Sequence, residues 1–128
     1  MKVSIRATIK ATEVTERVHE AMTAFWPDAT FDGDEQAYAT DCNDFRAAIW
    51  EQQIIDSVRS QLLHGMRSEV IRFKLDKQAA LQGKISFADK SPALGAVDVQ
   101  IDPEMDLEAF CWWLCPETEE GKIVGPTD

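Results

Sequence analysis

Residues 72–87, RFKLDKQAALQGKISF, constrain the fold more than any other stretch of the chain. Apolar and basic residues alternate over residues 71–75, which is typical of a half-buried strand. Asp76 then fits the N-cap of a short helix, and Gly83 fits the left-handed position that ends one. Alternation resumes over residues 84–87. The pattern therefore predicts a short helix between two strands that share a basic side.

The rest of the chain divides into strands and helices by the same reasoning. Alternation predicts strands over residues 3–9, 29–31, 36–40 and 97–101, and helical spacing predicts helices over residues 13–25, 44–62 and 104–114. We expect Thr12 and Asn43 to cap the first two helices and Pro103 to open the last. The second helix should break near residues 51–53, because the apolar stripes on either side are out of phase. A loop is expected over residues 91–95.

These elements predict an α+β fold of two layers, in which helices cover one face of a mixed, mostly antiparallel sheet. A chain of 128 residues is expected to form a single domain, here over residues 1–116, with a loosely ordered tail over residues 117–128. No apolar run approaches the roughly 18 residues of a membrane helix. The N-terminus enters a strand pattern without a signal peptide, so we expect a cytoplasmic protein with no membrane association.

Charge is distributed unevenly along the chain. The net charge of −10 argues against a general nucleic-acid binder. Residues 59–90, however, hold seven basic and three acidic residues, a net charge of +4, which leaves −14 for the remainder. The sequence is therefore that of an acidic protein with a basic middle.

The open face of the predicted sheet should carry most of the exposed basic side chains. In this interpretation the basic residues on that face are Arg6, Lys10, Arg72, Lys74 and Lys84. A polar face is also what solubility alone requires of a sheet exposed to water. Both interpretations, a binding face and a solvated face, stay open at this point.

Catalytic and metal-binding motifs do not stand out. The sequence has no phosphate-binding loop, zinc-protease pattern or GxSxG, so neither a cofactor nor a metal is expected. The three cysteines, Cys42, Cys111 and Cys115, are interpreted as small buried apolar residues in a reducing compartment. Trp112 and Trp113 lie among apolar neighbours, which favours packing in a core or interface over stacking on bases.

Four blocks of the sequence carry a resemblance to a known family. EQQIIDSVRSQLLHG, RFKLDKQAALQGKISF, LGAVDVQI and WWLCPETEEGK resemble, in this order, a small archaeal family of uncharacterised proteins. The KQAA block at residues 77–80 is the most specific part, and Asp76 stands where the family usually has asparagine. The resemblance implies a fold like that of the ribosomal protein that binds 5S ribosomal RNA. It also implies RNA binding, and an accessory role in the archaeal exosome.

Three hypotheses of function follow from the residues and the resemblance. The first is a non-catalytic RNA-binding module, with an accessory role in RNA processing or ribosome-related complexes. Its contact residues would be Arg6, Lys10, Arg72, Lys74, Lys77, Gln78 and Lys84. We expect this face to contact RNA backbone and shape more than bases, because it is predicted to lack aromatic residues. The second is a protein-interaction module or homodimer that uses the same face or the tryptophan pair. The third is an enzyme acting on a small anion near Lys77.

Overall fold

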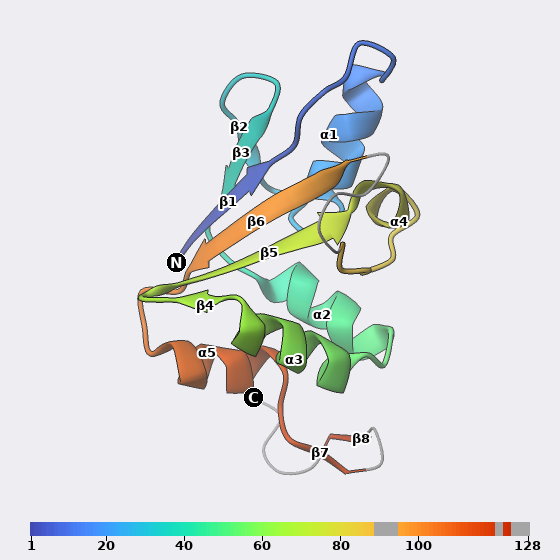
Figure 1. Ribbon diagram of the computed structural model, residues 1–128. Coiled ribbons are helices and arrows are strands. Elements are labelled where there is room, and N and C mark those ends of the chain that lie inside the picture. Colours follow the sequence, from blue (N-terminus) through green and yellow to red (C-terminus); the bar gives the residue numbers. More distant parts are fainter. Residues whose placement is uncertain (89–94, 120–121, 124–128) are drawn as a thin grey trace.

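The structure, a computed structural model, describes residues 1–88, 95–119 and 122–123 (Figure 1). The strands of the main sheet are β1 (Lys2–Arg6), β2 (Thr30–Phe31), β3 (Gln36–Ala39), β4 (Met66–Arg67), β5 (Val70–Asp76) and β6 (Ala96–Asp102). The helices are α1 (Thr15–Thr23), α2 (Asn43–Glu51), α3 (Ile55–His64), α4 (Lys77–Leu81) and α5 (Leu107–Leu114). Two further strands, β7 (Thr118–Glu119) and β8 (Lys122–Ile123), pair with each other in a small separate sheet.

The six strands of the main sheet follow the order β2-β3-β1-β6-β5-β4. Every neighbouring pair is antiparallel. β6 comes late in the sequence but lies between β1 and β5, so it joins the two halves of the sheet (Figure 1). Side chains of β1 and β5 that share a face are therefore separated by a side chain of β6.

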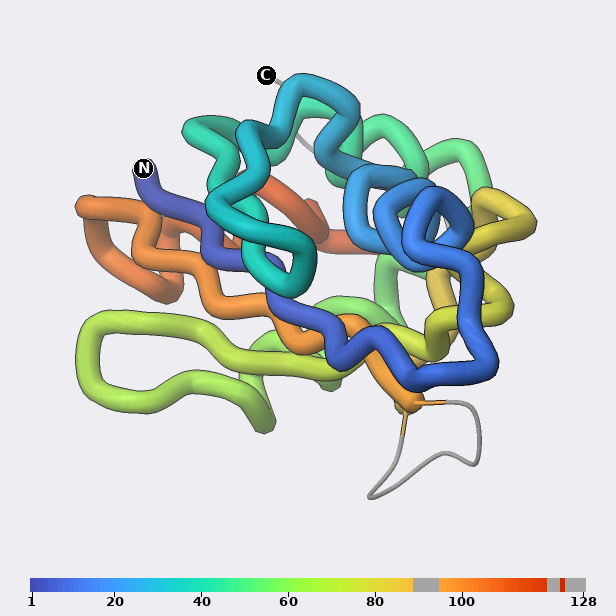
Figure 2. Tube along the Cα trace, turned by 90° about the horizontal axis from the view of Figure 1, so that it is seen from above, coloured from blue at the N-terminus to red at the C-terminus, as the bar shows by residue number. Residues whose placement is uncertain are grey.

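The helices cover one face of this sheet, and the hydrophobic core lies between the two layers. Alternate strand residues point into the core, including Val3, Ile5, Ala37, Ile71, Leu75, Val97, Val99 and Ile101. Phe73 of β5 stacks on Phe45 of α2, with ring centroids 5.7 Å apart. Figure 2 shows β1, β6 and β5 side by side and α1 next to α4. The predicted α+β fold, with helices on one face of an antiparallel sheet, is confirmed.

Three predicted helix starts are wrong, and local hydrogen bonds explain those of α1 and α5. α1 has Val14 and not Thr12 at its N-cap, because Lys10 and Glu13 close a turn in which the Glu13 carboxylate accepts from the Lys10 N–H at 2.9 Å. α2 begins at Asn43 itself, and its N-cap residue makes no side-chain cap bond. α5 begins after Asp106, whose carboxylate accepts from the Ala109 N–H at 2.9 Å, and not at Pro103.

The features predicted around the helix break and the short helix α4 are confirmed. α2 ends at Glu51 and α3 begins at Ile55, with Gln53 in the left-handed region at φ 57° between them. The Asp76 carboxylate caps α4 by accepting from the Ala79 N–H at 3.0 Å. Gly83 has φ 74°, as its predicted left-handed position requires.

The second strand predicted in the opening stretch does not form. Residues 84–87 contribute an isolated antiparallel bridge, between Leu75 and Phe87. The backbone of this segment bonds to β5 at two points, from the Asp76 N–H to the Ser86 carbonyl and from the Ala88 N–H to the Lys74 carbonyl. Nearer to α4, the Gln52 side chain donates to the Gly83 carbonyl at 2.9 Å and accepts from the Ile85 N–H at 3.0 Å. In the antiparallel register set by Leu75 and Phe87, the residue opposite Ile85 is Lys77, which already belongs to α4, so the pairing ends there and Gln52 satisfies the Ile85 N–H.

Other sequence-based expectations fall partly outside the described residues. The loop predicted over residues 91–95 lies outside them except for Gly95. The predicted tail over residues 117–128 includes the β7–β8 hairpin, and its other positions beyond residue 119 are not among the described ones. The domain boundary at residue 116 stays a prediction. Within the described ranges, no helix is both long and apolar enough to cross a membrane.

Candidate functional site

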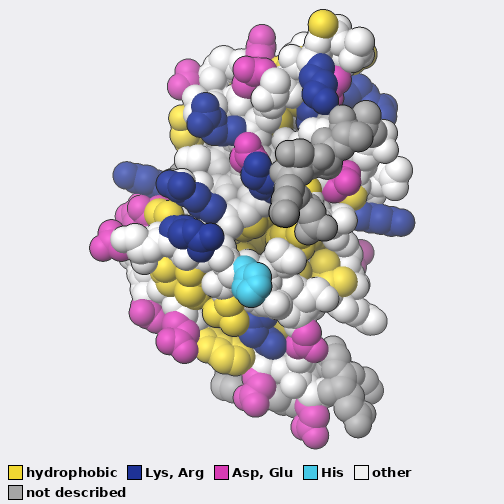
Figure 3. Space-filling view, viewed as in Figure 1, with side chains coloured by type: hydrophobic (Ala, Val, Ile, Leu, Met, Phe, Trp, Pro, Cys, Tyr) yellow, Lys and Arg dark blue, Asp and Glu magenta, His cyan; other side chains and the backbone are white. Residues whose placement is uncertain are grey.

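The open face of the main sheet presents two rows of polar side chains. Because residues directly opposite each other in antiparallel strands share a face, the register fixes these rows. One row runs Thr30, Tyr38, Ser4, Gln100 and Arg72 across β2, β3, β1, β6 and β5. The other runs Gln36, Arg6, Asp98 and Lys74 across β3, β1, β6 and β5. In Figure 3, Lys and Arg side chains gather over the strands with carboxylates among them.

A hollow of about 540 Å³ lies over the centre of this face, between β3 and β5. At its β5 side, Arg72 Nε donates to Gln100 Oε1 at 2.8 Å. Lys74 Nζ lies 3.7 Å from Asp98 Oδ1, and both side chains are about half exposed. An ion pair this exposed is weak, since water screens both charges. Lys74 can therefore exchange Asp98 for another anion at little energetic cost.

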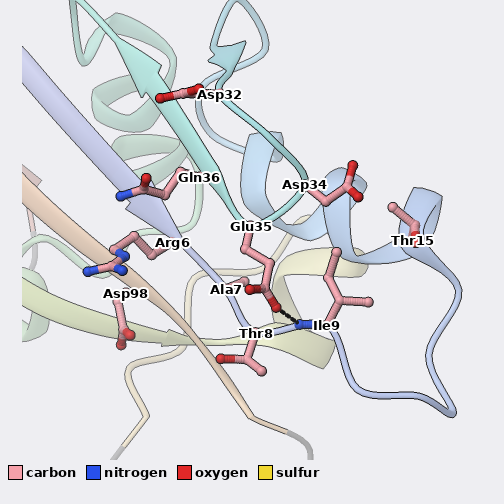
Figure 4. A pocket seen from close by; sticks show the side chains of 10 residues that line it. All are labelled: Arg6, Ala7, Thr8, Ile9, Thr15, Asp32, Asp34, Glu35, Gln36 and Asp98. Atoms are coloured by element: carbon pink, nitrogen blue, oxygen red, sulfur yellow. Dashed lines mark hydrogen bonds between the residues drawn. The ribbon is translucent and has the colours of Figure 1, made fainter.

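A second hollow, of about 720 Å³, adjoins the first and is acidic (Figure 4). Both hollows are lined by Arg6, Gln36 and Asp98. The second hollow is also lined by the carboxylates of Asp32, Asp34 and Glu35. Oε2 of Glu35 accepts a hydrogen bond from the Ile9 N–H at 2.7 Å. Figure 4 shows the Arg6 and Asp98 side chains as neighbours at one side of this hollow, with the Asp98 carboxylate directed away from the guanidinium. The open face is thus acidic at the β2–β3 turn and basic along β5.

The acidic hollow does not meet the requirements of a metal site. No group of three or more His, Cys, Asp or Glu side chains in the described part of the chain is arranged to hold a metal ion. The carboxylates of the β2–β3 turn are exposed to solvent. Their effect on the site is therefore electrostatic, because they repel anions from that end of the sheet.

The structure brings together three of the residues that the sequence singled out. Arg6, Arg72 and Lys74 are exposed on the open face, around the central hollow. Lys10, Gln78 and Lys84 are exposed but lie off the sheet, in the segment after β1, on α4 and after α4. They surround the ends of the strands and do not line either hollow.

Lys77 is not on the open face, because its side chain is buried. The residue as a whole is 3% exposed, and its Nζ lies 3.0 Å from Glu13 Oε2 and 3.0 Å from the carbonyl oxygen of Thr8. The ammonium group thus holds the segment after β1 against the start of α4. Lys77 therefore cannot serve as the cation that the small-anion hypothesis requires, because Glu13 already neutralises its charge inside the protein.

Sequence reasoning missed several residues of this face. Lys2 lies opposite Asp102, and Arg67 of β4 lies opposite Val70 at the sheet edge. Tyr38, directly opposite Ser4, places an aromatic ring where none was expected. Alternation within residues 36–40 indicates that Tyr38 and the buried Ala37 point in opposite directions. The sequence did not show that β3 pairs with β1, and this pairing is what places Tyr38 on the open face.

The tryptophan pair is held in the helical layer by arginines. The guanidinium of Arg46 lies over the rings of Trp50 and Trp113, at 4.2 and 4.6 Å from their centroids. Arg59 lies 5.1 Å from the ring centroid of Trp112, which is 47% exposed. Trp113 also packs on Phe110, with ring centroids 5.9 Å apart. Packing thus explains the position of Trp113 in the sequence. The ring of Trp112 contacts Arg59 but is otherwise about half exposed to solvent.

The cysteines have the buried environment that the sequence predicted. Burial raises the pKa of Cys42 and Cys115 to about 12 and that of Cys111 to about 11. Since the thiolate is the reactive form, thiols with such pKa values are inert at neutral pH. The cysteines therefore offer no nucleophile to either hollow.

Comparison with known proteins identifies the family. A family model described as RNA binding matches residues 2–102, and the chain belongs to that RNA-binding family. A UPF0201 protein of Thermococcus kodakarensis is 32% identical over 130 residues, covering 94% of this chain and 93% of that protein. The crystal structure of a UPF0201 protein from Methanococcus jannaschii is similar with a TM-score of 0.87 and 26% identity, over 98% of this chain and all of that one.

A further relative is longer than this chain. A UPF0200/UPF0201 protein of Archaeoglobus fulgidus is 29% identical over the whole of this chain, but the chain spans only 41% of that protein's length. The family resemblance expected from the four sequence blocks is confirmed by these matches. The likeness to the ribosomal protein and the exosome role stay predictions.

Proposed function

We propose that this protein binds RNA through the open face of its main sheet and does not catalyse a reaction on it. The observation that carries the proposal is the extent of the RNA-binding family match. It runs from residue 2 to residue 102 and so spans all six strands of the sheet. The helical layer covers the other face, which leaves the open face as the surface that the sheet offers to a ligand.

In this proposal, phosphates contact the β5 side of the central hollow. Arg72 and Lys74 stand two residues apart on the same strand, so both side chains point to the same side. The Arg72 guanidinium has five N–H donors, of which the bond to Gln100 uses one. Lys74 exchanges its exposed partner Asp98 for a phosphate. Arg6 is a third cation within the same hollow.

Contacts of this kind recognise RNA backbone with little dependence on sequence. Such binding suits a protein that accompanies other factors in RNA processing or in ribosome-related complexes. We include that accessory role, within the cytoplasm, in the proposal.

The test is fluorescence anisotropy with a labelled RNA at low salt. The double variant Arg72→Glu/Lys74→Glu should lose most of the binding, because it reverses two phosphate-binding charges. The variant Arg17→Glu/Ala47→Glu/Ala109→Glu is the matched control: it makes the same change of −4 in net charge at exposed positions of α1, α2 and α5.

Near-equal losses in the two variants would mean that net charge governs the interaction and that no particular face is used. Absence of binding by the unaltered protein at low salt would refute the proposal. Circular dichroism spectra of both variants should match that of the parent, since every substituted side chain is exposed.

A protein-interaction role is the second candidate, and two exposed apolar side chains favour it. Trp112 of α5 is 47% exposed and Leu63 of α3 is 50% exposed. α3 and α5 pack on each other within the helical layer. Sedimentation velocity of the parent protein and of Trp112→Ser tests this role. A dimer that dissociates in the variant would support it, and a monomer at every concentration would exclude a homodimer.

A further inference from the structure

We propose that the open face is built for single-stranded RNA, with one unpaired base stacked on Tyr38. This inference rests on the proposed function, and it specifies the form of RNA that the face accepts. Tyr38 is 44% exposed, whereas its neighbour Ala37 is fully buried. Of the large apolar side chains that are exposed in the described residues, Tyr38 is the one that stands on the open face.

The ring of Tyr38 is available to a ligand. No ring contact or side-chain hydrogen bond engages it within the part of the chain that the structure describes. Its strand neighbours on this face, Thr30 and Ser4, have small side chains that leave space above the sheet. An exposed, unengaged ring on the same face as a basic strand can serve as the platform on which a single-stranded nucleic acid stacks a base.

The side chains between Tyr38 and the basic strand are polar and uncharged. Ser4 and Gln100 fill the two positions that separate Tyr38 from Arg72 in the same row. The bond from Arg72 Nε to Gln100 Oε1 fixes the Gln100 amide and leaves its nitrogen as a donor. Three strand spacings of about 4.8 Å separate Tyr38 from Arg72, roughly 14 Å in all. A short run of nucleotides, beginning at a base stacked on Tyr38, can therefore reach the β5 cations with its following phosphates.

The charges on the face set the direction of the RNA. Asp32, Asp34 and Glu35 line the hollow at the β2–β3 turn and repel phosphates there. Arg72 and Lys74 attract phosphates on β5. The backbone should therefore lead from the base on Tyr38 across β1 and β6 to the β5 cations, and away from the acidic hollow.

A duplex does not fit this arrangement. Its bases are already stacked and paired, so none can stack on Tyr38 without being unpaired. Its second phosphate backbone would also approach the carboxylates of the acidic hollow. The face should thus prefer unpaired RNA to a duplex of the same sequence.

The test compares Tyr38→Ala and Tyr38→Phe, with Trp112→Ala as the matched control for loss of an exposed aromatic side chain on the other layer. Stacking of one base contributes enough that Tyr38→Ala should weaken single-stranded binding about 5- to 150-fold. Tyr38→Phe keeps the ring and should stay within about twofold of the parent. Trp112→Ala should have no effect, and binding to the duplex should not change in any of the three variants.

A scan with abasic nucleotides identifies the stacked base. In the parent protein, one abasic position of a short RNA should weaken binding more than its neighbours. In Tyr38→Ala the same position should give no further loss, because the base and the ring form one coupled pair.

The outcomes separate this inference from the proposed function. If the parent binds single-stranded RNA and Tyr38→Ala binds equally well, the stacking inference is wrong while RNA binding stands. A loss in Trp112→Ala alone would move the stacked base to the helical layer and overturn the inference. If the parent binds neither form of RNA, both proposals fail.

Discussion

The buried ammonium group of Lys77 links α4 to the segment after β1, through Glu13 and the carbonyl oxygen of Thr8. Its side chain is 4% exposed and its partner Glu13 is 21% exposed, so the two ends of the ion pair differ in their access to water. Glu13 can be rehydrated when its partner is lost, but Lys77 cannot. Removing one member of a buried pair is destabilising chiefly because of the charge that stays behind.

We therefore predict an unequal double-mutant cycle for this pair. Glu13→Ala should lower the free energy of unfolding by about 3–5 kcal/mol, because it leaves the Lys77 ammonium buried without a counter-charge. Lys77→Met should be milder, since the apolar side chain fills the same space. The double variant should be more stable than Glu13→Ala alone. Urea unfolding measures all four proteins, and a double variant less stable than either single one would contradict this account.

The same carboxylate predicts how stability depends on pH. The Lys10 backbone N–H and, after it, the Lys77 ammonium lower the pKa of Glu13 below its ordinary value of 4.5. A group whose pKa is lowered on folding stabilises the protein above its unfolded pKa, and this contribution is lost as the pH falls through the folded value. The stability gap between the parent and Glu13→Gln should stay constant from pH 7 to about pH 5. It should then narrow in more acidic solution, which urea unfolding at each pH measures; a gap that stays constant in acid would be the contrary result.

At the scale of the elements, β5 presents a core face and an open face in strict alternation. Phe73 is 8% exposed and stacks on Phe45, whereas Lys74 is about half exposed and pairs weakly with Asp98. Phe73→Ala should cost about 3–5 kcal/mol of unfolding free energy. Lys74→Ala should cost less than about 1 kcal/mol. Thermal or chemical unfolding of the two variants measures the ranking, and the reverse order would place the wrong face of β5 in the core.

Alternation made this part of the fold predictable from sequence, because side chains of a strand point to opposite faces with a period of two. Asp76 and Gly83 were predictable for a similar reason, since a cap and a left-handed glycine act within one helical turn. Thr12 and Pro103 gave wrong helix starts because Glu13 and Asp106 make competing hydrogen bonds. The sequence around a helix start does not show which of two neighbouring residues will cap the helix.

The candidate site was less predictable because it depends on which strands are neighbours. Arg6 and Lys74 were both expected on the open face, yet Asp98 between them became evident only once β6 was placed in the centre of the sheet. Lys77 was expected with the basic side chains of the open face, but its ammonium group is buried in an ion pair with Glu13, 64 residues earlier. Both results depend on contacts between segments that are far apart in the sequence. The periodicity of a single segment does not predict such contacts.

At the scale of the whole molecule, the net charge of −10 acts against binding of any polyanion. A local basic strand must then supply the attraction, and binding should depend steeply on salt. With about three to five phosphate contacts on single-stranded RNA, the slope of log affinity against log salt should be about −2 to −3.5. Anisotropy titrations between low and physiological salt measure the slope, and Lys74→Ala should make it shallower. A slope near zero would show that phosphates are not the ligand groups.

The central position of β6 also governs when the protein can fold. Ser4 and Gln100 pair across almost a hundred residues of sequence, and Arg72 meets Gln100 only after the segment that follows α4. As the chain emerges from a ribosome, β1 can pair with β3, and β5 with β4, before β6 exists, and each half then exposes the edge that β6 later covers. Such edges are templates for aggregation. Pairing at long sequence separation is slow. Synthesis of β6 therefore joins the two half-sheets around one core, and we expect the chain to be prone to aggregation until that strand has been made.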